Sequence, residues 1–385
     1  MISHTAMSPD AGQPKLHHIA ADDTIELTVL VPDCMNFYGT WERAEPPKEA
    51  RFRFVVGRAR WQRVAGQWYL QHYPGALSAL LRQFHPDVVD IWQEPWSLVC
   101  AQAVWLTRRL CPNARILVET EQNLYKHLPP PFQQFQSYVL HRTHFLIGRS
   151  QEAIQVARRK GYMGPAEVVP NGVDCDLFRP VQEEKRIGPA ERFVMGFVGR
   201  LVSEKGVYDL LQSLTHLPER VHLLCIGDGP ERPALEGEVR RLRLESRVLF
   251  TGSLPYRQLP EWIHRMDALV LPSHTTPRWK EQFGRVLIEA GACGKPVIGS
   301  SSGAIPEVVA DAGLIFPEGD VRALAAAVRR LTDDPDLCRT LGHRGRERAV
   351  RCFSWQAIAT QMRAIYRRLC PQTASNTPDA RSEAL

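Results

Sequence analysis

Residues 197–207 read Phe-Val-Gly-Arg-Leu-Val-Ser-Glu-Lys-Gly-Val, and this stretch decides which folds the chain can adopt. An apolar run ends at Gly199, a loop with Arg200 and Lys205 follows, and a helical pattern begins near Gly206. Short apolar, β-branched runs followed by helical patterns recur through most of the chain. Such alternation is typical of parallel sheets with helices on both faces.

This strand–helix pattern occurs in two sets, separated by a polar stretch near 180–192. The strands that we predict span 25–31, 51–56, 87–92, 115–119 and 144–148, then 193–199, 221–226, 247–251, 268–271, 296–299 and 313–316. The predicted helices between them span 76–84, 95–110, 151–160, 207–217 and 232–244. Two doubly wound, Rossmann-like domains with a cleft between them are therefore expected.

The pattern also sets the expected domain boundaries. We predict an N-terminal domain over 23–185 and a C-terminal domain over 186–353. Residues 1–22 and 371–385 are polar and aperiodic, so both are expected to be flexible tails. Residues 354–370 form an amphipathic helical pattern with its apolar side chains on one side.

Composition places the chain among soluble globular proteins, with 44% hydrophobic and 23% charged residues. Its nine cysteines include no C-x-x-C pair, which argues against a disulfide framework and for a reducing compartment. The N-terminus has no signal-like apolar core, and no run of 18 apolar residues occurs. We therefore predict a cytoplasmic protein.

Much of the net charge of +6 comes from one segment, residues 43–68, where basic side chains are interleaved with aromatic ones. Two interpretations stay open: a solvated surface, or peripheral contact with anionic lipids at the inner face of a membrane. No nucleic-acid-binding motif accompanies the segment, so a nucleic-acid partner is not expected.

Arg200 and Lys205 are the first candidates for chemistry. Two cations beside a helix N-terminus suit a diphosphate, because the helix dipole and free N–H groups add to their field. The alternative is a pair of solvated charges at a strand end. A second loop, 226–232, resembles a dinucleotide fingerprint, but Arg232 replaces its third glycine, so a dehydrogenase is disfavoured.

The most specific segment is Glu281-Gln-Phe-Gly-Arg-Val-Leu-Ile-Glu289. We expect a helix with an apolar body to begin in this segment. Eight residues correspond to about 12 Å along a helix, so the two carboxylates could hold two ends of one long polar ligand. Glu289 would be costly if buried unpaired, and either sugar hydroxyls or a structural ion pair with an arginine could satisfy it.

Residues 294–307 predict a strand, a small-residue turn and a helix start. Ser302 and Gly303 would allow close approach of backbone to a ligand. Glu307 is expected either in the site or as a charge at the helix N-terminus.

Together these motifs resemble the family 4 retaining glycosyltransferases, which have the GT-B fold of two facing Rossmann-like domains. The resemblance is close over 168–307, where the G-R-x4-K-G loop, the G-D-G-P motif, the E-x7-E motif and the G-x-I-P-E turn occur in the family's order. It implies that the helix over 354–370 crosses back to the first domain. It also implies retention of anomeric configuration without a metal or other cofactor.

Carried over residue by residue, the resemblance implies a donor site. Arg200 and Lys205, after Gly199, would grip the diphosphate of a nucleotide-sugar, and Glu289 would hold the ribose. Glu281, with backbone N–H groups around Phe283 and Gly284, would contact the donor sugar, which makes Arg200, Lys205 and Glu281 the expected catalytic residues.

The first domain departs from the family pattern. The glycine-rich turn expected after the first strand is missing from residues 31–40, and Glu121 stands near the position of a frequent histidine. Glu94 ends another predicted strand, so Glu94 and Glu121 are candidates for binding acceptor or donor hydroxyls.

The predicted function is transfer of a hexosyl unit to a polysaccharide, lipid-linked or small-molecule acceptor. A sugar-nucleotide hydrolase or epimerase and a non-catalytic sugar-nucleotide-binding protein stay open as alternatives.

Overall fold

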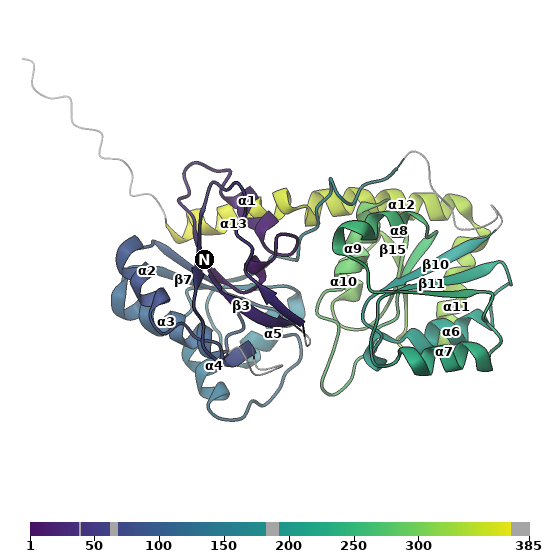
Figure 1. The fold of residues 1–385 in the computed structure, drawn as a ribbon, viewed down its shortest axis with the longest axis horizontal. Coiled ribbons are helices and arrows are strands. Elements are labelled where there is room, and N and C mark those ends of the chain that lie inside the picture. Colours follow the sequence, from purple (N-terminus) through teal and green to yellow (C-terminus); the bar gives the residue numbers. More distant parts are fainter. Residues whose placement is uncertain (38–39, 62–67, 182–191, 371–385) are drawn as a thin grey trace, which may run out of the picture.

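The computed structural model describes residues 1–37, 40–61, 68–181 and 192–370, which form two α/β domains (Figure 1). The N-terminal sheet is parallel, with strand order β5-β2-β1-β6-β7-β8-β9. Its strands are β1 (Ile2–Ser3), β2 (Thr28–Pro32), β5 (Arg53–Gly57), β6 (Val88–Trp92), β7 (Arg115–Thr120), β8 (Phe145–Gly148) and β9 (Ala166–Val168). A small hairpin, β3 (Cys34–Phe37) and β4 (Thr40–Arg43), stands beside it.

Alternation along the N-terminal strands divides their side chains between two cores. Leu30, Ile116 and Leu146 belong to one core, whereas their neighbours Val31 and Leu117 belong to the other. The first core is covered by α2 (Ala76–Phe84), α3 (Leu98–Leu110) and α4 (Phe132–Leu140). The second is covered by α1 (Gln13–Ile19) and α13 (Trp355–Leu369), while α5 (Gln151–Arg159) packs beside β8 and β9.

The C-terminal sheet is also parallel, with strand order β12-β11-β10-β13-β14-β15. Its strands are β10 (Phe193–Val198), β11 (Val221–Ile226), β12 (Val248–Gly252), β13 (Ala268–Leu271), β14 (Val297–Ser300) and β15 (Gly313–Phe316). Its helices are α6 (Val207–Leu214), α7 (Arg232–Arg241), α8 (Leu259–His264), α9 (Arg285–Ala292), α10 (Ile305–Val309), α11 (Val321–Asp333) and α12 (Pro335–Arg348). Every predicted strand is therefore present, with ends within three residues of the prediction.

The prediction of a flexible tail over residues 1–22 is wrong. This segment supplies β1, a buried 3₁₀ turn (Thr5–Met7) and α1. Its apolar side chains are few, yet Ala6, Leu16 and Ile19 are completely buried against α13. Tertiary packing orders a segment whose own composition favoured disorder.

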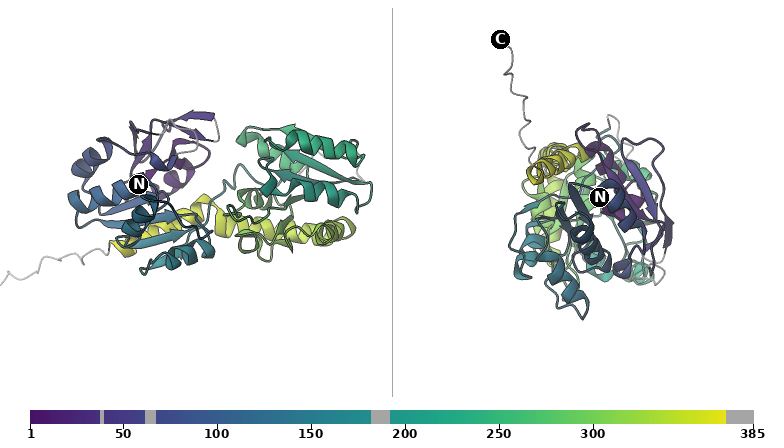
Figure 2. Two further views of the ribbon diagram at one scale, coloured as in Figure 1. Left: turned by 90° about the horizontal axis from the view of Figure 1, so that it is seen from below. Right: turned by 90° about the vertical axis from the view of Figure 1, so that its left-hand side faces the viewer.

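The predicted crossover helix is confirmed. Helix α13, drawn in yellow, leaves the C-terminal domain and lies along the N-terminal domain (Figures 1 and 2). The chain crosses between domains twice, and the two crossings are paired, because Val173 N donates to Phe353 O at 2.8 Å and Trp355 N to Val173 O at 3.3 Å. Gly172 is required there, since a Cβ would lie 2.2 Å from the ring of Trp355.

Two predicted segments lie outside the described residues: most of the polar stretch between the domains (182–191) and the tail over 371–385. No helix within the described ranges combines the length and apolarity that crossing a bilayer requires.

Candidate functional site

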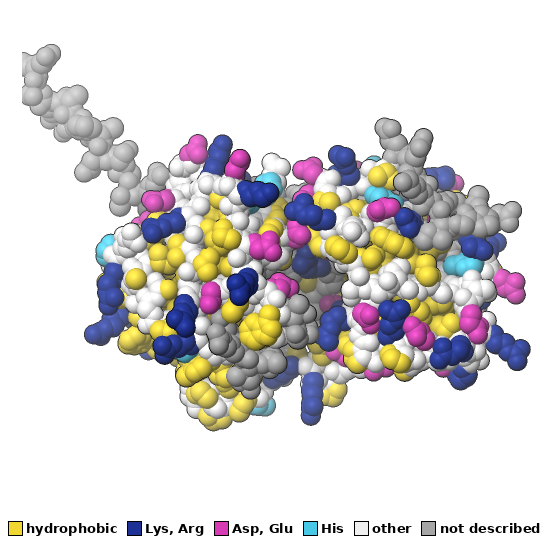
Figure 3. All heavy atoms as spheres, viewed as in Figure 1, with side chains coloured by type: hydrophobic (Ala, Val, Ile, Leu, Met, Phe, Trp, Pro, Cys, Tyr) yellow, Lys and Arg dark blue, Asp and Glu magenta, His cyan; other side chains and the backbone are white. Residues whose placement is uncertain are grey.

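The candidate site lies between the domains, where Figure 3 shows a hollow. In a doubly wound sheet, ligands bind at the carboxyl ends of the strands, where the strand order reverses. In the C-terminal sheet that point lies between β10 and β13. The loops that follow these two strands carry Arg200 and Lys205 on one side and Ser273 to Glu281 on the other.

Lys205 and Glu281, two of the expected catalytic residues, lie in contact. Lys205 Nζ lies 2.6 Å from Glu281 Oε2, and Ser273 Oγ donates to the same oxygen at 2.8 Å. The Glu281 side chain is 8% exposed and that of Lys205 20%. The Lys205 ammonium also lies 4.9 Å from the centre of the Trp279 ring. A cation in reach of the cleft is thereby held beside a nearly buried carboxylate.

The loop that carries Lys205 is fixed by its neighbours. Gly206 has φ +67° and a Cβ there would lie 2.0 Å from Pro272 O, so only glycine fits. Helix α6 begins at Val207, as predicted, directly after this glycine. Arg200 is exposed after β10, on the same loop.

The G-D-G motif has a structural explanation. A Cβ on Gly227 would lie 1.9 Å from Gly199 O, and one on Gly229 would lie 2.3 Å from Leu201 O. The two glycines therefore let this loop press against the Arg200 loop, and Leu201 N donates to Asp228 O at 3.0 Å. The motif supports the loop that carries the cation.

The E-x7-E segment differs in form from the prediction. Helix α9 begins only at Arg285, with Gly284 in the left-handed region as its N-cap, so Glu281 lies in the preceding loop and the two glutamates share no helical face. Phe283 is 4% exposed and packs against Phe353, so its side chain belongs to the core.

Glu289 is buried, 5% exposed, within α9. Burial raises the pKa of its carboxyl, although Arg285 and the hydroxyl of Tyr256 favour the ionised form. The Arg285 guanidinium lies 3.5 Å from Glu289 Oε1. The arginine partner considered for the structural alternative is therefore present, although its contact is long.

The turn after β14 holds the main chain of Glu281. A Cβ on Gly303 would lie 2.0 Å from Glu281 O, and Ala304 N donates to that oxygen at 3.1 Å. Ser302 is buried, and its hydroxyl lies 2.9 Å from Thr275 Oγ1. These small residues therefore allow the turn to approach the main chain of Glu281 closely.

Several side chains join the two domains across the cleft. Asn123 Nδ2 donates to Glu281 O at 2.8 Å, and Gln282 Nε2 donates to Glu121 O at 3.1 Å. Glu307, in the first turn of α10, accepts from Gln151 N at 3.1 Å, at the N-terminus of α5. Lys280 Nζ contacts Glu152 at 2.9 Å. Sequence reasoning misses the contact of Asn123, because nothing local links this residue to residue 281.

Glu94 and Glu121, the candidates of the first domain, are neighbours. Glu94 Oε1 accepts from Glu121 N at 2.7 Å and Oε2 accepts from Thr120 Oγ1 at 2.8 Å. Burial raises the pKa of Glu94 to about 7, against these two hydrogen bonds. Glu121 is 37% exposed and lies 3.6 Å from Arg149. Glu94 thus ties two loops together, whereas Glu121 is open to the cleft side.

The basic segment over 43–68 is less amphipathic than its sequence indicates. Phe52 is buried in the second core and Phe54 is partly buried, whereas Trp61 is 58% exposed and its ring lies 4.5 Å from that of His72. Arg63 lies outside the described residues.

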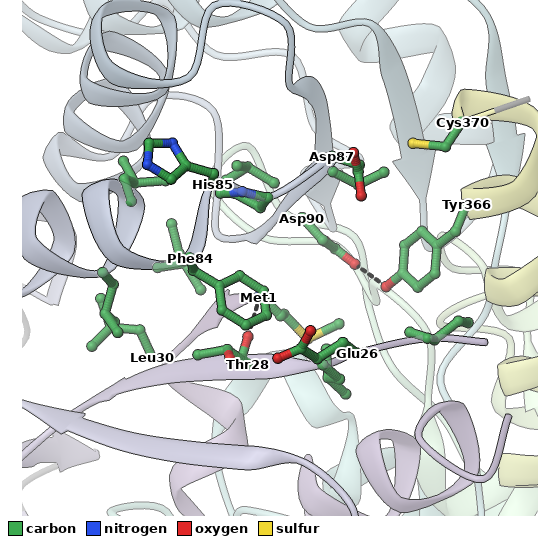
Figure 4. A pocket seen from close by; sticks show the side chains of 18 of the residues that line it. Met1, Glu26, Thr28, Leu30, Phe84, His85, Asp87, Asp90, Tyr366 and Cys370 are labelled. Atoms are coloured by element: carbon green, nitrogen blue, oxygen red, sulfur yellow. Dashed lines mark hydrogen bonds between the residues drawn. The ribbon is translucent and has the colours of Figure 1, made fainter. Parts of the chain in front are cut away.

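A cavity of 680 Å³ lies elsewhere, at the amino ends of β2 and β6 (Figure 4). Tyr366 donates to Asp90 Oδ2 there at 2.6 Å, and burial together with Glu119 raises the pKa of Asp90 to about 7. None of the predicted site residues lines this cavity. Within the part of the chain that the structure describes, no three His, Cys, Asp or Glu side chains are grouped to hold a metal ion.

Most of the C-terminal domain is similar to a known family. Residues 179–348 match the family model of the glycosyl transferases group 1. Similar curated proteins include a glycogen synthase of Mycobacterium tuberculosis, 36% identical over 205 residues, which are 52% of this chain and 47% of that protein. An alpha-maltose-1-phosphate synthase of Mycolicibacterium smegmatis is 34% identical over 227 residues, 52% of this chain and 56% of that protein. The chain thus spans about half the length of the curated relatives it matches.

Solved structures match over both domains. A sucrose-phosphate synthase from Thermosynechococcus elongatus is 25% identical, covers 96% of this chain and 98% of its own, and gives a TM-score of 0.68. The Anabaena protein HepE, solved with UDP and glucose, is 18% identical over 95% of this chain and 98% of its own, also with a TM-score of 0.68. The predicted GT-B fold is thereby confirmed.

Proposed function

We propose that this protein transfers a hexosyl unit from a nucleotide-diphosphate sugar to an acceptor with retention of anomeric configuration. The observation that carries the proposal is the Lys205–Glu281 pair at the strand-order reversal of the C-terminal sheet, beside Arg200. The group 1 match and the UDP complexes of a structural neighbour support a nucleotide-sugar as donor.

In the proposed reaction the two cations do the electrostatic work. The bond between the anomeric carbon and the diphosphate oxygen breaks, and the leaving diphosphate gains negative charge that Arg200 and Lys205 neutralise. Glu281, already oriented by Ser273 and by the fixed main chain of its loop, binds hydroxyls of the donor sugar. The acceptor hydroxyl forms the new bond on the face that the nucleotide leaves, and its proton passes to the departing diphosphate. Because Arg200 and Lys205 would both stand at the diphosphate, we propose that no metal or cofactor is needed.

The other residues predicted to bind the donor would surround the nucleotide-sugar. Glu289 would hold the ribose, and backbone groups at Gly199, Phe283, Gly284, Ser302 and Gly303 would border the donor. Glu307, which bonds to α5 of the other domain, would keep the donor half of the cleft closed against the acceptor half. Glu121 is the better acceptor-side candidate, because Glu94 already uses both carboxylate oxygens.

The test is a screen of UDP-, GDP- and ADP-sugars for protein-dependent nucleotide release, with and without added saccharide and with EDTA. Arg200→Ala and Lys205→Ala should each lose about 2–3 kcal/mol of transition-state stabilisation, about 30- to 150-fold in kcat/KM. Arg220→Ala, which removes only a surface ion pair with Asp333, is the matched control. Full turnover by either cleft variant would contradict the assigned roles.

The alternatives give different results in the same screen. Release that is equal with and without acceptor indicates a hydrolase, and a changed sugar on an intact nucleotide indicates an epimerase. Binding of a donor without turnover indicates a sugar-nucleotide-binding protein. The proton NMR coupling of the anomeric hydrogen in the product tests retention directly.

A further inference from the structure

We propose that the N-terminal domain carries a saccharide-binding platform, formed by Trp68, Tyr69, Trp96 and Phe132, that receives a sugar ring of the acceptor. The proposal rests on the function proposed above and names the acceptor class: a glycan chain. Tyr69, Trp96 and Phe132 carry no role predicted from the sequence, whereas Trp68 ends the basic segment over 43–68.

The four rings form one half-buried group. Trp96 lies 5.3 Å from both Trp68 and Tyr69, and Tyr69 lies 5.1 Å from Phe132 in an edge-on arrangement. None of the four is fully buried, so each keeps part of its surface outside the core. Aromatic faces are electron-rich and apolar, which suits the C–H face of a pyranose ring.

Two buried amide side chains border the platform, and each has one polar atom without a hydrogen-bond partner among the described residues. Gln93 Oε1 lies 2.8 Å from His4 Nδ1, whose ring lies 5.6 Å from that of Trp68. Among the described residues, Gln93 Nε2 has no hydrogen-bond partner, although Gln93 is only 3% exposed. Gln136 lies one helical turn after Phe132 on α4, is also 3% exposed, and its Oε1 has no partner in the described part of the chain.

These atoms favour a sugar over a lipid tail. A buried amide donor or acceptor is costly when it is left unpaired, and an alkyl chain would offer neither of them a hydrogen bond. Because both atoms are buried, a sugar hydroxyl would be joined to each through a bridging water, which accepts from Gln93 Nε2 or donates to Gln136 Oε1. A few convergent polar groups in a mostly aromatic surface are typical of small-molecule sites.

The platform lies where the acceptor must come. Gln93 and Trp96 belong to the loop after β6, and His4 follows β1, so they stand at the strand-order reversal of the N-terminal sheet. Gln136 Nε2 donates to Gln122 Oε1 at 3.0 Å. Gln122 is the residue between Glu121 and Asn123, which contact the Glu281 loop, so the platform adjoins the donor half of the site.

The experiment uses four tetrasaccharides as probes: α-1,4-linked glucose, β-1,4-linked glucose, β-1,4-linked N-acetylglucosamine and α-1,6-linked mannose. Each is titrated into the full chain without donor, and binding is followed by calorimetry and tryptophan fluorescence. We expect at least one to bind. Trp96→Ala should weaken that binding about tenfold or more, and Trp96→Phe, which keeps a ring, should stay within about threefold of the parent.

Trp105→Ala is the matched control, because Trp105 is 54% exposed on α3 and, among the described residues, no ring pair joins it to the platform. If Trp96→Ala fails to fold by circular dichroism, Tyr69→Ala decides in its place. The proposal is overturned if none of the four tetrasaccharides binds, or if binding is equal in the parent and the platform variants. Trp96-dependent binding of a decyl-chain detergent without a saccharide, such as decylphosphocholine, would assign the platform to a lipid and also overturn it.

The two proposals can fail separately. Tetrasaccharide binding that depends on Trp96, without nucleotide release from any donor, would refute glycosyl transfer and leave the platform standing. Donor turnover with a platform that binds no saccharide would do the reverse.

Discussion

Replacing Lys205 with Met tests whether the Glu281 carboxylate depends on its ion pair. The substitution keeps the length of the side chain but removes the ammonium that lies 2.6 Å from Glu281 Oε2. Glu281 is nearly buried, and in the Lys205→Met variant its Oε2 would keep, of the two described contacts, the hydrogen bond from Ser273 Oγ at 2.8 Å. The variant should therefore be destabilised even without donor present.

The magnitude follows from burial. Removing one partner of a buried ion pair costs about 3–5 kcal/mol. Water reaches Lys205 through its 20% exposure, and Ser273 still stabilises the carboxylate, so we expect about 2–3 kcal/mol. Glu281→Gln keeps an acceptor for Ser273 and removes the buried carboxylate charge, while water still reaches Lys205, so it should cost only about 1 kcal/mol, alone or combined with Lys205→Met. The coupling in the double-mutant cycle is then about 2–3 kcal/mol.

The assay is scanning calorimetry of the parent, both single variants and the double variant at one pH and without nucleotide. A free-energy change of 1 kcal/mol shifts the midpoint of a domain of this size by about 2–4 °C, so the double variant should melt several degrees above Lys205→Met. Additive losses in the cycle would refute the reasoning, because they would mean that Lys205 and Glu281 do not stabilise each other.

Three further predictions concern other parts of the molecule. Burial raises the pKa of Glu94 from 4.5 to about 7, so the folded state holds a proton that the unfolded state loses, and the free energy of unfolding should fall by about 3 kcal/mol as the pH rises from about 4.5 to 7. Urea titrations across that range should show a smaller decline for Glu94→Gln, and an unchanged decline would contradict the prediction. Gly206→Ala should lower the affinity for the donor at least tenfold, since the added Cβ would lie 2.0 Å from Pro272 O and displace the Lys205 loop. Isothermal titration with the preferred nucleotide-sugar measures this affinity, and an affinity equal to that of the parent would contradict the prediction. The exposed basic residues of 43–61 should bind anionic vesicles in a co-sedimentation assay, more weakly as salt rises, and equal sedimentation with neutral vesicles would count against membrane contact.

The fold was largely predictable because parallel strands buried on both faces leave continuous apolar runs. Strands such as β11 and β13 match their predicted bounds for that reason. The ordered N-terminus was not predictable in this way. Its buried residues are spaced irregularly among polar ones, and the helix that covers them, α13, lies more than 300 residues away in the sequence.

The candidate site divides in the same way. Arg200, Lys205 and Glu281 carry local signals, since each stands in a motif of fixed spacing. Asn123 and the aromatic platform do not, because their importance comes from contacts between segments that are distant in the chain. The idea that Glu281 and Glu289 share a helix failed for a local reason: Gly284, in the left-handed region, delays the helix to Arg285.

Helix α13 has a consequence for how the protein forms during synthesis. One core of the N-terminal domain contains Ile358, Met362 and Ile365, which the ribosome makes only after the whole C-terminal domain. The domain that emerges first therefore cannot close that core until about 180 further residues have left the exit tunnel. The C-terminal domain, whose core is drawn almost entirely from its own residues, can finish folding first, and until α13 arrives the apolar faces of Leu16 and Ile19 stay open to chaperones.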